Sequence, residues 1–174
     1  MLALTHLPSP NMHACERTYV PVAPIDHVRA LEQHAAYCAA LQACRARVVT
    51  LDVNRNHPDG TFLEDTAIVL DEVAVLASMG TASRSAEPAA MESILRERRP
   101  NFRIDPPATL EGGDALRVGR TLLVGRSART SSAGIALLAA AVEPFGYQVV
   151  SVPVHGCLHL KTGCTALPDG RLLE

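Results

Sequence analysis

The sequence predicts an α/β fold in which a β-β-α-β unit recurs roughly every 50 residues. Three observations favour it: short β-branched runs alternate with aliphatic stripes of helical spacing, capping residues precede the stripes, and Gly or Pro separates the segments. Hydrophobic residues make up 48% of the chain, enough for one domain with a core, and an aromatic share of 3% makes that core aliphatic.

The first third of the chain is predicted to fold as strand, helix and strand. Residues 1–5 and 47–53 have the composition of strands. Asp26 is the expected cap of a helix that runs to about Ala43. The apolar positions of this helix recur at spacings of three and four, at Val28, Leu31, Ala35, Cys38 and Leu41.

A first β-β-α-β unit is predicted from residue 62 onward. It combines an extended segment over 62–70, a strand over 73–77, a helix from Pro88 to about Arg99, and a short strand around 102–104. The second unit has a hairpin over 115–124, a helix capped by Ser131 or Ser132 that ends at Pro144 and Gly146, and a strand over 147–152. A loop over 153–163 and a hairpin over 165–173 complete the chain.

Charge and composition exclude several classes of protein. The net charge of −2 comes from interspersed signs, so no basic patch indicates nucleic acid. No apolar run approaches the roughly 20 residues that span a bilayer. The N-terminus lacks the basic and apolar regions of a signal peptide, and five cysteines form no C-x-x-C pair. We therefore expect a cytoplasmic protein with reduced thiols.

Polar clusters fall in loops at strand ends. They are Asp59 with Glu64 and Asp65, Ser83 with Arg84, Glu111 with Arg129, and His159. Carboxylates suit a guanidinium, arginines suit an α-carboxylate, and a histidine near Glu111 suits acid–base chemistry. Alone, the Glu111-Gly112-Gly113-Asp114 segment is more typical of a hairpin turn. Together the clusters predict one cleft for an arginine-like amino acid.

Six segments in the same order and register resemble the dimethylarginine dimethylaminohydrolases, within the guanidino-modifying pentein superfamily. They are Leu31-Glu32-Gln33-His34, Phe62-Leu63-Glu64-Asp65, Ser83-Arg84, Leu110-Glu111-Gly112-Gly113-Asp114, Gly125-Arg126-Ser127-Ala128-Arg129-Thr130 and Leu158-His159-Leu160-Lys161-Thr162. The resemblance implies a pentein-type α/β propeller of ββαβ units around a pseudo-fivefold axis. Residues 1–174 would form a single partial domain with roughly three and a half of its five units.

The resemblance also implies roles for single residues. Glu111 and His159 correspond to the family's catalytic acid and histidine, and Asp59, Glu64 and Asp65 to contacts of the guanidinium and amine. Arg84 and Arg129 correspond to the carboxylate clamps, and Leu7 to the N-terminal loop that covers the substrate. The implied reaction releases citrulline through a covalent cysteine intermediate, without metal or organic cofactor.

The family's nucleophilic cysteine has no counterpart in this sequence, because it follows further units after the position of Glu174. Neither Cys157 nor Cys164 occupies that position. We therefore expect the chain alone to be inactive. It would act as part of a longer enzyme, as a partner subunit of a split enzyme or of a homo-oligomer, or as a non-catalytic binder of arginine-like ligands.

Two alternatives come from other classes. His155, Cys157, His159 and Cys164 are all zinc-ligand types within ten residues, although their spacing is not that of a common zinc motif. The second alternative is a structural or partner-binding domain without a small ligand.

Overall fold

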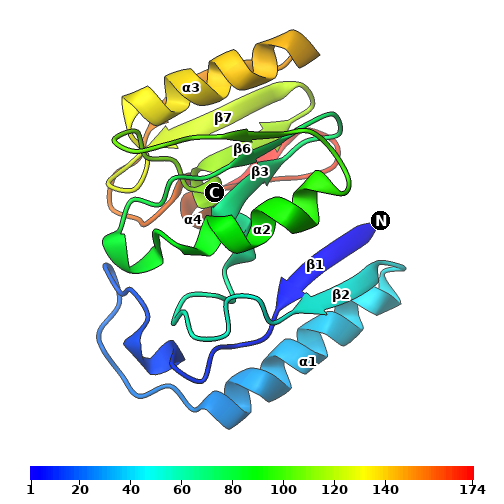
Figure 1. The fold of residues 1–174 in the computed structure, drawn as a ribbon, viewed down its shortest axis with the longest axis vertical. Helices are drawn as coiled ribbons and strands as arrows, with labels where there is room; N and C mark the ends of the chain where they lie inside the picture. Colours follow the sequence, from blue (N-terminus) through cyan, green and yellow to red (C-terminus); the bar gives the residue numbers. More distant parts are fainter. The chain divides into compact units, whose positions relative to one another are not determined.

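The structure is a computed structural model that describes all residues from 1 to 174. The chain separates into two compact units, Met1–Leu63 and Glu64–Glu174. No helix is both long and apolar enough to cross a membrane. The α/β class predicted from the sequence is confirmed (Figure 1).

The first unit is a β-α-β element, as predicted. Strands β1 (Leu2–His6) and β2 (Arg47–Leu51) pair in parallel, and helix α1 (His27–Ala43) packs against β2. The Asp26 carboxylate accepts a hydrogen bond from the Arg29 amide at 3.1 Å, which satisfies one of the unpaired amides at the start of α1.

The apolar stripe of α1 is only partly used for packing. Val28 is 66% exposed and Leu31 36% exposed, and the helix buries no residue fully. The half-buried positions of α1 are His27, Ala30, His34, Cys38 and Leu41, of which only Cys38 and Leu41 belong to the predicted apolar stripe. The spacing predicted the position of the helix correctly, but three of its five predicted apolar positions, Val28, Leu31 and Ala35, are exposed.

The second unit contains the two predicted β-β-α-β elements. In the first, β3 (Ala67–Val69) is antiparallel to β4 (Ala74–Leu76), and helix α2 (Glu87–Arg96) leads to β5 (Asn101–Arg103), parallel to β4. In the second, β6 (Ala115–Val118) is antiparallel to β7 (Thr121–Arg126), and helix α3 (Ser132–Val142) leads to β8 (Gln148–Pro153), parallel to β7. Helix α3 packs against β7 and β8, and Figure 1 shows it lying along β7.

Local details differ from the sequence prediction at three places. A 3₁₀ turn, Leu63–Thr66, interrupts the segment predicted as extended and carries Glu64 and Asp65. Helix α2 ends at Arg96, three residues before the predicted end. The predicted loop over 153–163 ends in a short helix, α4 (Leu160–Gly163), before the hairpin of β9 (Thr165–Ala166) and β10 (Leu172–Leu173).

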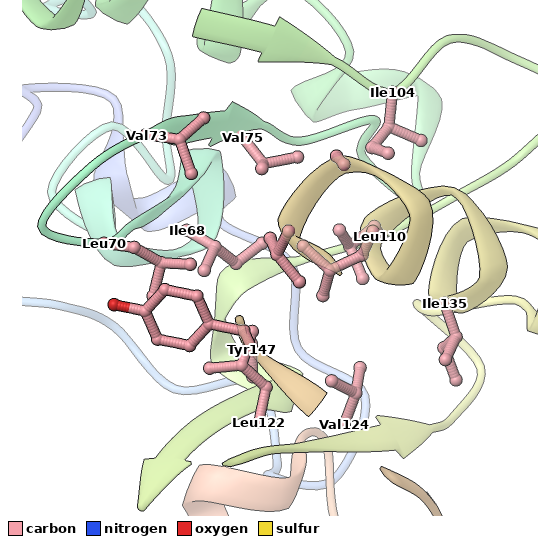
Figure 2. Packing of buried hydrophobic residues seen from close by; sticks show 14 of the residues in the cluster. Ile68, Leu70, Val73, Val75, Ile104, Leu110, Leu122, Val124, Ile135 and Tyr147 are labelled. Atoms are coloured by element: carbon pink, nitrogen blue, oxygen red, sulfur yellow. The ribbon is translucent and has the colours of Figure 1, made fainter. Parts of the chain in front are cut away.

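The core of the second unit is aliphatic apart from Tyr147, and it fixes the segment that carries the site. Figure 2 shows Leu110 among side chains from both β-β-α-β elements, including Ile68, Val75 and Ile135. Leu110 is fully buried, and its backbone exchanges hydrogen bonds with that of Ser78 at 2.8 and 3.2 Å. Burying a leucine side chain contributes about 1.5–3 kcal/mol. The residue after it, Glu111, is therefore held rigidly.

Candidate active site

Glu111 is the centre of a buried polar cluster. Its side chain is inaccessible to solvent. The Gly80 amide donates to Glu111 Oε1 at 2.9 Å, and Arg129 Nη1 donates to the same oxygen at 3.4 Å. The other oxygen, Oε2, lies 2.8 Å from His159 Nε2. One carboxylate thus joins three segments that are distant in sequence.

Glu111 and His159 form a charge-assisted pair. Burial by itself lowers the pKa of His159, but the hydrogen bond to Glu111 and the negative charges of Asp65 and Asp114 outweigh burial and raise that pKa above 6.5. Burial also disfavours ionisation of Glu111, yet the bonds from His159 and the Gly80 amide and the nearby arginines lower its pKa below 4.5. Both directions favour the charged forms of the two groups.

Two glycines let Asp65 and His159 approach this carboxylate. A Cβ on Gly112 would lie 1.9 Å from the Glu64 carbonyl oxygen, and one on Gly113 would lie 2.6 Å from His159 Nδ1 and 2.7 Å from Asp65 Oδ1. The Gly113 amide donates to Asp65 Oδ1 at 3.1 Å. The glycine pair is therefore a close-packed floor beneath the imidazole rather than a solvent-exposed hairpin turn.

Arg84 neutralises the acids from the other side. Its Nη1 donates to Asp65 Oδ2 at 2.8 Å and lies 3.9 Å from Glu111 Oε2. Its Nε and Nη2 donate to Glu87 at 2.9 to 3.2 Å. Burial alone lowers the pKa of Arg84, but Glu87 and Asp65 raise it, so the guanidinium is charged. All three side chains are at most 11% exposed.

The structure brings together five of the eight residues singled out in the sequence: Asp65, Arg84, Glu111, Arg129 and His159. Glu64 is not among them, because its side chain is 72% exposed and pairs with Lys161. Leu7 and Asp59 lie in the first unit. The Leu7 amide donates to the Leu51 carbonyl, and Asp59 is buried and accepts from the Glu16 amide at 3.1 Å.

Sequence reasoning missed Glu87. It occupies the first turn of α2, three residues after Arg84, and is 1% exposed. The spacing to Arg84 was the available signal, but an acid in a first helical turn is common without any partner. Its burial against Arg84 is visible only in the fold.

The four candidate zinc ligands do not form a site. The one group of three or more possible ligands with donor atoms within 4.8 Å of one another is Asp65, Glu111 and His159. Arg84 already provides the cation there. Cys157 Sγ donates to the His159 carbonyl oxygen at 3.4 Å, and its thiol therefore contacts the backbone rather than the imidazole.

Comparisons with known proteins give a family profile and individual relatives that match this chain. The profile of the arginine deiminase family matches residues 28–169. The N(G),N(G)-dimethylarginine dimethylaminohydrolase of Streptomyces coelicolor is 41% identical over 172 residues, which cover 98% of this chain and 67% of that protein. The protein of the same name from Pseudomonas aeruginosa is 35% identical over 150 residues, covering 85% of this chain and 59% of that protein.

Solved structures of the same kind superpose closely. A cysteine-to-serine mutant of the Pseudomonas aeruginosa protein, complexed with citrulline, aligns with a TM-score of 0.90 at 32% identity, over 95% of this chain and 66% of that chain. A histidine-to-glycine variant of a dimethylarginine dimethylaminohydrolase, solved as an adduct with S-methyl-L-thiocitrulline, aligns with a TM-score of 0.92 at 30% identity. The alignment covers 98% of this chain and 68% of that chain. The chain spans about two thirds of the length of these relatives or less.

Proposed function

Because this chain belongs to the arginine deiminase family, among the dimethylarginine dimethylaminohydrolases, we propose that it carries the acid–base half of an active site that hydrolyses methylated arginine to citrulline and an amine. The observation that carries the proposal is the buried Glu111–His159 pair, 2.8 Å apart and flanked by Asp65 and two arginines. Citrulline and a thiocitrulline bound to related proteins support an arginine-like ligand.

In the proposed reaction, His159 handles the proton. Because Glu111 holds Nε2, the other ring nitrogen, Nδ1, is the one that exchanges protons with the substrate in this proposal. A cysteine thiolate attacks the guanidinium carbon, and the C–N bond to the leaving amine breaks as Nδ1 gives that amine its proton. The same nitrogen then takes a proton from water, which attacks the carbon and displaces the thiolate to give citrulline.

We propose that the ligand's guanidinium contacts Asp65, with Glu64 as a further contact. Arg129 and Arg84 are the proposed contacts of the α-carboxylate. Arg84 has a second task in our proposal, since its bonds to Asp65 and Glu87 hold the Asp65 carboxylate in place.

We also propose that residues 1–174 are part of one pentein-type domain and do not complete the reaction by themselves. A nucleophile has to lie within hydrogen-bond reach of its base. The thiol of Cys157 donates to a carbonyl oxygen, and the hydrogen bond that Cys164 makes joins its amide to the Leu160 carbonyl. The thiolate would come from further residues of a longer chain or from a complementing partner.

A second candidate function is binding of arginine-like ligands without turnover. The same observation favours it, because the charged cluster is assembled in these 174 residues whereas no thiol contacts the His159 ring. This candidate predicts affinity without citrulline release, even in the presence of a complementing segment.

Calorimetric titration of the purified chain with L-citrulline and with dimethylarginine tests both functions. We expect saturable binding of both ligands and no citrulline release by the chain alone. Citrulline release after addition of a C-terminal segment that carries the family cysteine would support the enzyme over the binder. Absence of binding by either ligand would overturn both, and release that Cys157→Ser or Cys164→Ser abolishes would overturn the proposed source of the thiolate.

A further inference from the structure

Asp114 is a buried carboxyl group whose hydrogen bonds link separate parts of the site. It is 0% exposed and ends the 3₁₀ turn Gly112–Asp114, three residues after Glu111. No Lys, Arg or His nitrogen pairs with it. Burying such a group is costly unless its oxygens are hydrogen-bonded. Both of them are, and each bond reaches a segment that carries a site residue.

The first bond reaches the segment of His159. Asp114 Oδ1 accepts from the Leu160 amide at 2.9 Å. Leu160 follows His159 directly and begins α4, so this bond fixes the backbone from which the imidazole projects. A Cβ on Gly125 would lie 2.6 Å from the same oxygen and 3.0 Å from Leu160 Cβ, so the bond depends on a glycine at that position of β7.

The second bond reaches the segment of Arg129. Ser127 Oγ donates to Asp114 Oδ2 at 2.6 Å and accepts from the amides of Arg129 and Thr130 at 3.0 and 3.2 Å. Thr130 Oγ1 in turn accepts from the Glu111 amide at 3.1 Å. The turn that presents Arg129 is thereby connected at both ends to the segment of Glu111.

We infer that Asp114 is a positioning residue, which holds His159 through the Leu160 amide and Arg129 through Ser127 so that both meet the Glu111 carboxylate. The relevance of these positions to catalysis rests on the proposed function, whereas the positioning itself does not. Nothing in the inference requires Asp114 to touch the ligand.

The test compares the variants Asp114→Asn and Ser127→Ala with wild type by NMR titration of the His159 imidazole and by citrulline calorimetry. Asp65, Glu111 and Asp114 are the acids that act on His159, and Arg84 and Arg129 are the cations beside Glu111. We expect Asp114→Asn to lower the pKa of His159, shift its ring resonances and weaken citrulline binding about tenfold. Ser127→Ala, which keeps the bond to Leu160, should weaken binding with a smaller change at His159.

The control is Asp71→Asn, since Asp71 is an exposed acid that pairs with Arg117 in the same unit. Near-ultraviolet circular dichroism checks that each variant is folded. If Asp114→Asn does not fold, Ser127→Ala decides the question through binding and through the Arg129 and Thr130 amide shifts. An unchanged His159 titration in folded Asp114→Asn, or unchanged Arg129 and Thr130 amides in Ser127→Ala, would overturn the inference. Absence of citrulline binding in wild type would instead count against the proposed function and leave the NMR comparison decisive for positioning.

Discussion

Two clusters of arginines and acids connect the β-β-α-β elements of the second unit, and they differ in burial. The site cluster joins Arg84 and Arg129 to Asp65, Glu87 and Glu111, with side chains at most 11% exposed. The surface cluster joins Arg117 to Asp71 and Arg120 to Glu72, each at 2.8 Å, with side chains 31% to 72% exposed. Both arginines of the surface cluster also stack on the Tyr147 ring.

The comparison shows that the cost of losing one partner of an ion pair depends on whether the pair is buried or exposed. In the surface cluster, water and salt screen the charges, so either member can be lost at little cost. In the site cluster, removing one member leaves the others charged where water cannot compensate. A cluster of this second kind fixes the pKa values and orientations of its members, which is what a catalytic site requires.

The largest difference is expected when an arginine is removed. Arg84→Met leaves the buried carboxylates of Asp65 and Glu87 without this cation, so we expect the free energy of unfolding to fall by about 3–5 kcal/mol. Urea denaturation measures it. Arg117→Met, the matched change in the surface cluster, should leave the midpoint close to that of wild type. Equal losses in the two variants would contradict the contrast between the clusters.

A methyl group in the floor of the site should have the next largest effect. In Gly113→Ala the new Cβ lies 2.6 Å from His159 Nδ1 and 2.7 Å from Asp65 Oδ1, so one of them has to move. Overpacking of this kind costs about 1–3 kcal/mol, and we expect citrulline binding to be lost in calorimetry. Gly163→Ala is the control, because its Cβ meets only Cys157 Sγ at an ordinary 3.6 Å.

Neutralising Glu111 should weaken ligand binding. Glu111→Gln keeps the shape but removes a charge-assisted hydrogen bond, which should cost roughly 1.5–3 kcal/mol of binding free energy. Calorimetry with citrulline measures the loss, with Glu72→Gln as the surface control. Equal affinity of Glu111→Gln and wild type would count against the role proposed for Glu111.

The same variant has a pH signature. The stabilisation from His159, whose folded pKa is raised, is present below its unfolded pKa near 6.5 and fades as the pH rises through the folded value. The stabilisation from Glu111, whose folded pKa is lowered, is present above its unfolded pKa of about 4.5 and fades as the pH falls through the folded value. The stability gap between wild type and Glu111→Gln should therefore be widest between these limits. A gap that does not vary with pH would argue against the ion pair.

The smallest effect is expected from salt. The stability contributed by the surface cluster should decline as the ionic strength rises, because the Debye length falls from about 10 Å at 0.1 M to 3 Å at 1 M. The midpoints of thermal denaturation of wild type and Asp71→Asn should therefore become equal at high salt. The midpoints of wild type and Arg84→Met should remain different at high salt. Equal midpoints for these two proteins would show that water and salt reach the site cluster.

The order of elements was predictable because periodicity and caps are local properties. Asp26 and Ser131 cap their helices as expected, with the Ser131 hydroxyl accepting from the Gly134 amide at 3.1 Å. The proximity of Glu111 and His159 could be predicted only because several segments of the sequence resemble, in the same order, those of a known family. The exposure of the Glu64 side chain could not be predicted, because Glu64 and Asp65 lie on a 3₁₀ turn rather than on a strand whose side chains alternate between two faces. The roles of Glu87 and Asp114 depend on burial, which their short spacings do not encode.

The contacts that define the site join residues far apart along the chain. The sequence separations are 48 for Glu111–His159, 48 for Gly113–Asp65 and 46 for Leu160–Asp114, whereas the β6–β7 hairpin closes over a few residues. Long loops close at a greater entropic cost than hairpins, so the hairpins are expected to form early in folding and the polar cluster late. Pulse-labelled hydrogen exchange during refolding, comparing the Gly113 and Leu160 amides with those of β7, measures this order, and simultaneous protection of all of them would contradict it. The buried cluster to which the chemistry is assigned is then the part of the molecule that forms last.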